Sequence, residues 1–289
     1  MRRLIVNADD FGYTSGVNRA VAETHRARIV TSATLMATGA AFDDAVRIAH
    51  SNPGLSVGCH IVLLDGSPLL PASQIPGLIT QGKLPAFRQG WGGFSAAALR
   101  GALAAQHIEA EATAQIRKLQ QAGIRVSHVD THKHVHIFPQ VLQPVLRAAK
   151  ACNVDAIRNP FEPARLSLLS QDIRLWRRWL GVGLLNAFAG SFRRTVRNAG
   201  MISPKGTLGI IATGKLNERL LRSLIEHMPQ GTWELVCHPG YDDAQLRGLR
   251  TKLLESRQKE LQILTCPDLP QWLTNQGVDL ISYCDLVPI

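Results

Sequence analysis

The feature that most constrains the fold of this chain is its alternation of short β-branched runs with longer amphipathic stretches. Eight short runs have the length and residue types of strands: Leu4–Ala8, Ala33–Ala37, Ser56–Val62, Arg125–Asp130, Asp155–Arg158, Thr207–Ala212, Trp233–Cys237 and Asp279–Tyr283. Helical patterns lie at Ser15–Arg28, Phe42–His50, Ala96–Ala122, Pro139–Ala151, Lys215–His227 and Asp242–Leu264. Strand followed by helix, repeated in this way, predicts parallel strands joined by right-handed crossovers. We therefore expect an α/β fold, an irregular (β/α)8-type barrel, with a doubly wound open sheet as the alternative.

Two stretches interrupt the alternation, residues 64–94 and residues 159–204. Both follow the C-terminal end of a predicted strand, where the loops of a barrel shape the substrate site. The full length of 289 residues suits one α/β barrel. The prediction is therefore one domain over residues 1–289 that carries two insertions at strand ends.

Charge and cysteine content narrow the class of protein further. The net charge is +10, and residues 158–200 hold eight Arg against two acids. No zinc-finger spacing, helix-turn-helix signature or RNP-like aromatic pattern accompanies this basic excess, so nucleic acid is not an expected partner. Five cysteines without a CxxC pair favour a reducing cytoplasm over a disulfide framework. The N-terminus lacks a signal-peptide pattern, and no apolar stretch reaches the length of a spanning helix.

Polar side chains gather where several predicted strands end. They are Asp9 and Asp10 after the first strand, His60 at the third, His128 to His136 at the fourth, Arg158 at the fifth and His238 at the seventh. Singly, such an Asp is often a helix N-cap and such a His a buried structural residue. Convergence from five strands instead predicts an active site, because barrel enzymes build theirs from C-terminal strand ends.

The segment from His128 to His136 places four His and one Asp at alternate positions, and so on one face while the chain stays extended. Alternate residues of a strand lie about 6.6 Å apart. Two nitrogens bound to one ion at about 2.1 Å are at most about 4 Å apart. An extended segment can therefore give one metal a single imidazole, and His60 with one carboxylate of Asp9 and Asp10 is expected to complete a two-His, one-Asp site. A polar strand end that faces solvent is the alternative.

Two adjacent carboxylates allow a division of labour, in which one binds a metal and the other accepts a proton from an activated water. His238 is expected to approach from the opposite side of the barrel and to protonate a leaving group. Its alternative interpretation is a turn histidine before Pro239.

Five motifs together resemble the YdjC-like carbohydrate deacetylases, which include chitooligosaccharide deacetylases and hopanoid-biosynthesis-associated deacetylases. The resemblance runs in order over nearly the whole chain and is weakest in the Arg-rich stretch 159–204. The motifs are Asn7-Ala8-Asp9-Asp10-Phe11-Gly12, Thr31-Ser32-Ala33-Thr34-Leu35-Met36, Gly58-Cys59-His60, the segment His128 to His136, and Cys237-His238-Pro239.

The resemblance implies a metal-dependent N-deacetylase with an irregular barrel related to polysaccharide deacetylases. It implies one divalent ion, Mg²⁺, Zn²⁺ or Mn²⁺, bound by Asp10, His60 and His132. Asp9 is then the general base and His238 the acid. Asp130, His134, His136 and Arg158 are expected to support the ligands or to contact substrate, Arg158 by orienting Asp9; Lys133 should point away from the metal by strand alternation.

The expected reaction is hydrolysis of the acetamide of an N-acetylated amino sugar, with release of acetate. The alternatives are another metal-assisted reaction on a sugar, such as phosphoester hydrolysis or isomerisation, and a non-catalytic carbohydrate- or membrane-binding protein. Residues 159–204 combine Trp and Leu with many Arg, which predicts a lid that contacts an anionic membrane and selects a lipid-linked substrate. An ordinary helical insertion packed on the barrel is the alternative. A homodimer is one option for the oligomeric state.

Overall fold

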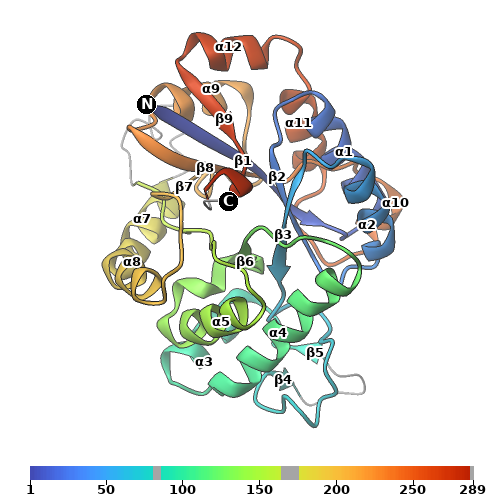
Figure 1. Ribbon diagram of the computed structural model, residues 1–289, viewed down its shortest axis with the longest axis vertical. Coiled ribbons are helices and arrows are strands. Elements are labelled where there is room, and N and C mark those ends of the chain that lie inside the picture. Colours follow the sequence, from blue (N-terminus) through green and yellow to red (C-terminus); the bar gives the residue numbers. More distant parts are fainter. Residues whose placement is uncertain (81–85, 164–175, 287–289) are drawn as a thin grey trace.

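The computed structural model describes residues 1–80, 86–163 and 176–286. Its centre is a curled, seven-stranded parallel sheet in the order β6-β3-β2-β1-β8-β7, with β9 paired to β1 (Figure 1). The strands are β1 (Arg2–Phe11), β2 (Ser32–Leu35), β3 (Ser56–Ile61), β6 (Val129–Thr131), β7 (Thr207–Leu208), β8 (Gly231–Cys237) and β9 (Val278–Ile281). A curled parallel sheet confirms the predicted barrel-like α/β fold and not the doubly wound alternative.

The long strand β1 organises the sheet. One of its edges pairs with β8 from Arg2 to Ala8. The other edge is shared, because β9 pairs with residues 2–5 and β2 pairs from Asn7 onward. The eighth predicted strand therefore forms, but it lies beside the first half of β1 and does not close a regular barrel.

The predicted strand Asp155–Arg158 is wrong as a full strand. This segment makes only two isolated parallel bridges, Val129 with Ile157 and Ala156 with Ile202. The predicted strand Thr207–Ala212 is also shorter than expected, since β7 ends at Leu208. The bridges continue the curl of the sheet beyond β6, and they place Arg158 on its inner side.

Helices surround the sheet (Figure 1). They are α1 (Ser15–Arg26), α2 (Phe42–Ser51), α3 (Trp91–Leu99), α4 (Ala105–Gln121), α5 (Pro139–Ala151), α7 (Trp176–Leu185), α8 (Ala189–Asn198), α9 (Glu218–Glu226), α10 (Ala244–Arg247), α11 (Glu255–Leu264) and α12 (Leu269–Asn275). Side-chain caps begin three of them, because Thr14 accepts from the amide of Val17, Asn217 from that of Leu220 and Asp243 from that of Leu246. Of the described helices, none combines the length and apolarity that crossing a bilayer requires.

Two predicted helices are each divided. Ala96–Ala122 is two helices, α3 and α4, because the chain turns at Gly101 with φ of +67°. Asp242–Leu264 is also two helices, α10 and α11, separated by turns around residues 248–254. The predicted insertion 64–94 carries the hairpin β4 (Ile79–Thr80) and β5 (Ala86–Phe87) and the start of α3. Residues 164–175 of the second insertion lie outside the described residues; α7, α8 and a short 3-10 helix (Asn186–Phe188) follow them.

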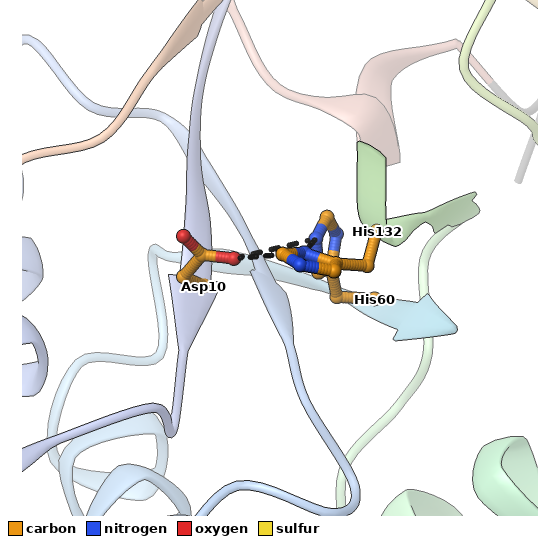
Figure 2. A group of neighbouring side chains, drawn as sticks. All are labelled: Asp10, His60 and His132. Atoms are coloured by element: carbon orange, nitrogen blue, oxygen red, sulfur yellow. Dashed lines mark hydrogen bonds and ion pairs between the residues drawn. The ribbon is translucent and has the colours of Figure 1, made fainter. Parts of the chain in front are cut away.

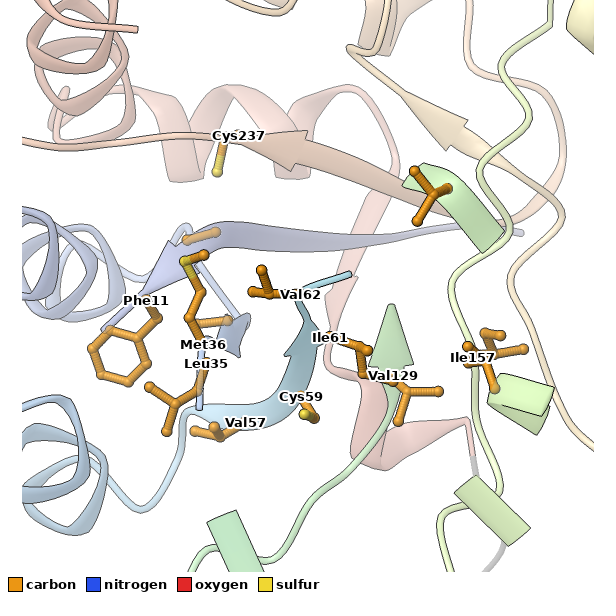
Figure 3. Packing of buried hydrophobic residues seen from close by; sticks show 14 of the residues in the cluster. Phe11, Leu35, Met36, Val57, Cys59, Ile61, Val62, Val129, Ile157 and Cys237 are labelled. Carbon is orange, nitrogen blue, oxygen red and sulfur yellow. The ribbon is translucent and has the colours of Figure 1, made fainter. Parts of the chain in front are cut away.

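The two faces of the sheet differ in chemistry. Along β3, Val57, Cys59 and Ile61 alternate with Gly58 and His60, and the apolar residues pack in the main hydrophobic core (Figure 3). The same alternation in β1, β6 and β8 places a buried polar set on the inner face. This set comprises Asn7, Asp9, His60, His128, Asp130 and Glu234. Burying this many polar groups is costly unless they satisfy one another, so the inner face is where the site is expected.

Candidate metal centre and active site

A bulge near the end of β1 brings Asp9 and Asp10 to the same site. In a regular strand, consecutive side chains point to opposite faces. Here the pairing register with β2 shifts between Ala8 and Phe11, and Asp10 adopts a left-handed φ of +64°. Asp is among the few non-glycine residues that tolerate this conformation, so the sequence permits the bulge.

Neighbouring strands supply the first imidazole. The parallel register of β3 and β6 sets His60 opposite Asp130, so both side chains lie on the inner face. His60 Nδ1 and Asp130 Oδ1 are 2.7 Å apart. Asp130 also pairs with Arg158, so its oxygens act as acceptors; His60 therefore donates from Nδ1, and its Nε2 faces Asp10 and His132.

The second imidazole comes from a turn, and here the extended prediction for residues 128–136 is wrong. The strand β6 ends at Thr131, and residues 132–137 form 3-10 turns. Lys133 and His134 have left-handed φ values of 55° and 56°. The turn leaves His132 aimed at the site and partly exposed, while Lys133 points outward to an ion pair with Asp65. Lys133 does point away from the site, but through this turn and not through strand alternation.

Asp10, His60 and His132 converge (Figure 2). Asp10 Oδ1 lies 3.5 Å from His60 Nε2 and 3.4 Å from His132 Nδ1, and the two nitrogens are 3.3 Å apart. Three atoms bound tetrahedrally to one ion at about 2.1 Å would be about 3.4 Å apart. The spacing of these three residues therefore fits a single divalent cation, and the one-carboxylate, two-imidazole donor set suits such an ion.

The charges around His60 also favour a cation. Burial alone would lower the pKa of His60, but Asp130, with Asp9 and Asp10, raises that pKa to about 9. The carboxylates therefore outweigh the cost of desolvating a positive charge at this point. A bound metal cation would be stabilised by the negative potential of the same carboxylates.

Arg158 fixes Asp9 beside this cluster. Its Nη1 and Nη2 donate to Asp9 Oδ2 and Oδ1 at 2.8 and 2.6 Å, a bidentate pair. Asn7 Nδ2 also donates to Asp9 Oδ1, at 3.0 Å. Although burial raises the pKa of Asp9, Arg158 holds it well below its usual range. Asp9 is therefore a carboxylate whose orientation is set, as the resemblance implies for Arg158.

Three carboxylates surround the fully buried Arg158: Asp9, Asp130 and Glu234. Glu234 was not among the residues predicted from the sequence. Arg158 also pairs with Asp130, and its Nε donates to Glu234 Oε1 at 2.9 Å. Tyr283 donates its hydroxyl to Glu234 Oε2 at 2.6 Å. A single acid inside the otherwise apolar predicted strand Trp233–Cys237 was the available signal for Glu234. This network distributes the charge of a buried cation over fixed partners.

His238 lies beside Asp9. His238 Nε2 is 3.9 Å from Asp9 Oδ2, and its backbone amide donates to Glu260 Oε2 at 2.6 Å. Burial lowers the pKa of His238 to about 4, despite the nearby Asp9 carboxylate. His238 is therefore neutral at pH 7 before any proton moves.

The two remaining histidines of the segment have different surroundings. His136 is buried, with Nε2 3.2 Å from the Arg158 carbonyl and Nδ1 2.6 Å from Thr131 Oγ1. Because a carbonyl only accepts, His136 donates from Nε2 and supports the backbone of Arg158. His134 Nδ1 is buried and has no hydrogen-bond partner among the described residues. Neither histidine joins the cluster of Asp10, His60 and His132.

Arg257 also belongs to the site, and no sequence signal pointed to it. It comes from α11 and is 1% exposed. Its Nη2 lies 2.5 Å from Asp10 Oδ2. Burial would raise the pKa of Asp10, but Arg257 and the two imidazoles lower it well below its usual range. Asp10 is therefore ionised and bridges Arg257 to the two histidines.

Together these features define a class of protein: an α/β fold of parallel strands whose ends carry one Asp and two His at metal-ligand spacing beside a buried Asp–Arg pair. The model of the family described as YdjC-like protein matches residues 3–275. A carbohydrate deacetylase from Brevibacillus brevis is 32% identical, over 98% of this chain and 99% of that protein. A chitooligosaccharide deacetylase from Escherichia fergusonii is 30% identical, over 99% of both chains. The chain belongs to the YdjC-like family.

Solved structures agree on the fold. A candidate cellobiose-phosphate cleavage protein from Enterococcus faecalis superposes with a TM-score of 0.76 over 99% of both chains, at 23% identity. A lactam utilization protein from Thermus thermophilus superposes with a TM-score of 0.51 over 97% of this chain and 99% of that chain, at 14% identity. The family model and the curated relatives confirm the family resemblance in the sequence, and the relatives' names agree with the expected carbohydrate deacetylase.

Proposed function

We propose that this protein is a metal-dependent carbohydrate N-deacetylase, with Asp10, His60 and His132 as the ligands of one divalent ion. The observation that carries the proposal is the mutual spacing of 3.3 to 3.5 Å among one carboxylate oxygen and two imidazole nitrogens. The relatives named carbohydrate deacetylase and chitooligosaccharide deacetylase support the substrate class. The carboxylates of Asp9 and Asp130 both pair with Arg158. Because this guanidinium already neutralises them, they are poor ligands for a second ion, which supports a one-metal site over the two-metal arrangement of phosphoester hydrolysis.

When bound, the ion would supply Lewis-acid polarisation of the acetamide carbonyl and lower the pKa of a water. Asp9 accepts the proton of the attacking water. Its Oδ1 already accepts from Arg158 and Asn7, whereas Oδ2 accepts only from Arg158 among the described residues. Oδ2 therefore has a lone pair left to accept the proton of the water, and this oxygen is the one that faces His238. The water oxygen first bonds to the carbonyl carbon, and the C–N bond breaks in a second step, when the nitrogen is protonated.

His238 protonates the departing amine. Since its pKa of about 4 leaves it neutral at pH 7, His238 has to receive a proton during the reaction before it can donate one. Asp9 Oδ2, 3.9 Å away, is the group from which that proton passes. The products are acetate and a free amino sugar, and both enzyme groups return to their starting states.

Substitution of the three ligands tests the metal site. We expect Asp10→Ala, His60→Ala and His132→Ala each to lose both bound metal and acetate release, because removing one of three ligands opens the site. Metal content by mass spectrometry and acetate release from N-acetylglucosaminides are the measurements. His50→Ala, at an exposed position of α2, is the matched control that keeps both. Full metal occupancy in all three variants would contradict the assignment.

The choice of substrate and metal can be tested together. A panel of N-acetylated amino sugars, soluble chitooligosaccharides and lipid-linked glucosaminides, is assayed for acetate with Zn²⁺, Mg²⁺ and Mn²⁺. Carboxylate and imidazole ligands accommodate all three ions. Turnover that is confined to lipid-linked sugars would favour a role such as hopanoid biosynthesis, whereas turnover of soluble oligosaccharides would favour chitooligosaccharide breakdown.

We also propose that residues 159–204 contact an anionic membrane surface peripherally, from the cytoplasmic side. Trp176 and Leu180 of α7 are each 48% exposed. Arg193, Arg194 and Arg197 of α8 are exposed, while Phe192 on the same helix packs against Phe161. Exposed Trp and Leu with nearby Arg suit the headgroup region of an anionic bilayer.

Vesicle binding separates this lid from an ordinary helical insertion. We expect binding to anionic vesicles that weakens with salt, and a selective loss of lipid-linked turnover in Trp176→Ser/Leu180→Ser. The matched control is Trp91→Ser/Leu99→Ser, which removes an exposed Trp and an exposed Leu from α3. No vesicle binding, with equal losses on soluble and lipid-linked substrates, would refute the lid. A homodimer remains a separate prediction, to be measured by sedimentation.

A further inference from the structure

The two oxygens of Asp10 have separate partners. Oδ1 faces the two imidazoles at 3.4 and 3.5 Å, whereas Oδ2 lies 2.5 Å from Arg257 Nη2. Both Asp10 and Arg257 are buried, so water does not compete for this pair. The carboxylate is therefore held with one oxygen toward the candidate metal position and one toward a fixed cation.

Arg257 itself is held firmly. Its Nε donates to the Leu253 carbonyl at 3.2 Å, and its own carbonyl accepts from the amide of Gly240 at 3.2 Å. A Cβ at Gly240 would lie 3.0 Å from Arg257 Cδ, so the arginine stem fills the space beside that glycine. Gly240 follows the Cys237-His238-Pro239 motif, so α11 and the end of β8 together set the position of the guanidinium.

We propose that Arg257 is a positioning residue that restricts Asp10 to coordination through one oxygen. This inference rests on the proposed metal site. A carboxylate that binds through both oxygens would occupy two coordination positions and donate electron density to the ion from a second atom. With Oδ2 bound to Arg257, Asp10 would offer a bound ion a single oxygen, which would leave positions for water and for the substrate carbonyl and preserve more of the ion's Lewis acidity.

A simpler role would be neutralisation of a buried Asp10 that otherwise costs stability. That role requires only a positive charge near Asp10, and it makes no demand on the coordination number of the ion. The two roles therefore differ in what happens to the bound metal, and a spectroscopic readout separates them.

The experiment replaces the native ion by Co²⁺, whose visible absorption weakens as its coordination number rises. We expect Arg257→Met to bind one Co²⁺ per chain as the wild type does, but with weaker visible absorption, because Asp10 now adds its second oxygen. We expect kcat to fall about 10- to 100-fold with little change in KM. Arg247→Met removes an exposed arginine of α10 and should change neither the spectrum nor kcat.

Arg257→Lys keeps the positive charge but replaces the planar fork by a single ammonium. If Arg257→Met does not fold, Arg257→Lys still allows the test. It should show the same spectral change to a smaller degree. An unchanged spectrum, a loss of Co²⁺ or an unchanged kcat in both variants would overturn the role of Arg257. A wild-type chain that binds no Co²⁺ would overturn the proposed metal site as well, so the two failures are distinguishable.

Discussion

At the scale of single residues, the two adjacent carboxylates show how environment separates identical groups. Asp9 is clamped by Arg158 on its two oxygens, whereas Asp10 divides its oxygens between Arg257 and two imidazoles. Both are ionised, so protonation state does not distinguish them. Orientation does, because only Asp10 faces both histidines at ligand spacing.

This division predicts that Asp9→Asn keeps the metal and loses turnover. The amide preserves the shape of the side chain but cannot accept the proton of water, and general-base catalysis contributes about 10² to 10⁴ in rate. His238→Ala should behave in the same way. Metal content and acetate release from an unactivated N-acetyl sugar are the measurements, with Asp43→Asn on α2 as an exposed control. Near-normal turnover in either variant would show that its proposed role is wrong.

At the scale of secondary structure, departures from regular geometry place the reactive groups. The bulge at Asp10 turns two consecutive side chains toward one site, and the left-handed pair Lys133 and His134 redirects the chain after His132. In β3, the absence of a side chain at Gly58 makes room for a buried ring. The His128 ring lies where a Cβ of residue 58 would be, only 2.4 Å away, and stacks on Tyr283 at 3.5 Å.

We therefore expect Gly58→Ala to destabilise the fold. A methyl group in this position forces the His128 ring and its partner Tyr283 to shift, and overpacking of this kind costs about 1 to 3 kcal/mol. Urea unfolding followed by circular dichroism measures the difference. Gly54→Ala, just before β3, is the matched control, because its Cβ would meet only His25 at 3.6 Å. Equal unfolding midpoints for the two variants would contradict the argument.

At the scale of the whole molecule, the sheet has an apolar outer face against helices and a polar inner face. Arg158 pairs with three of the inner groups, Asp9, Asp130 and Glu234. His136 extends this network, and burial lowers its pKa to about 4. Protonation of such a group opposes folding.

The pH dependence of stability follows from this shift. An unfolded histidine has a pKa of about 6.5, so between about pH 6.5 and pH 4 the unfolded state binds a proton that the folded His136 does not. The free energy of unfolding should therefore fall as pH falls through this window. Urea titrations with a chelator present, from about pH 7 to pH 4, measure the slope.

Comparison of variants assigns that slope to His136. In His136→Gln the dependence should be shallower, while His50→Gln, at an exposed site, should retain the wild-type slope. A variant without His136 that keeps the full slope would mean that other groups cause the pH dependence.

Much of this site was predictable from local sequence. The alternation of strand-like runs with helical patterns predicted the parallel strands. The polar residues at several strand ends predicted that His60 and the carboxylates Asp9 and Asp10 lie at one site. Arg257 was not predictable, since an arginine in an amphipathic helix usually faces solvent. The division of the predicted helix Asp242–Leu264 was also hidden, because the turns between α10 and α11 depend on packing.

The sequence by itself therefore determined the alternation of strands and helices, the family and the gathering of Asp and His residues at strand ends, since periodicity and motifs are local properties of the chain. Only the tertiary structure decided that β9 pairs beside β1, that the segment after Thr131 leaves the extended conformation, and that Arg257 contacts Asp10. The physical reason is that these features depend on contacts between residues far apart in sequence. Asp10 and Arg257 are 247 positions apart, and neither carries a local signal of the other.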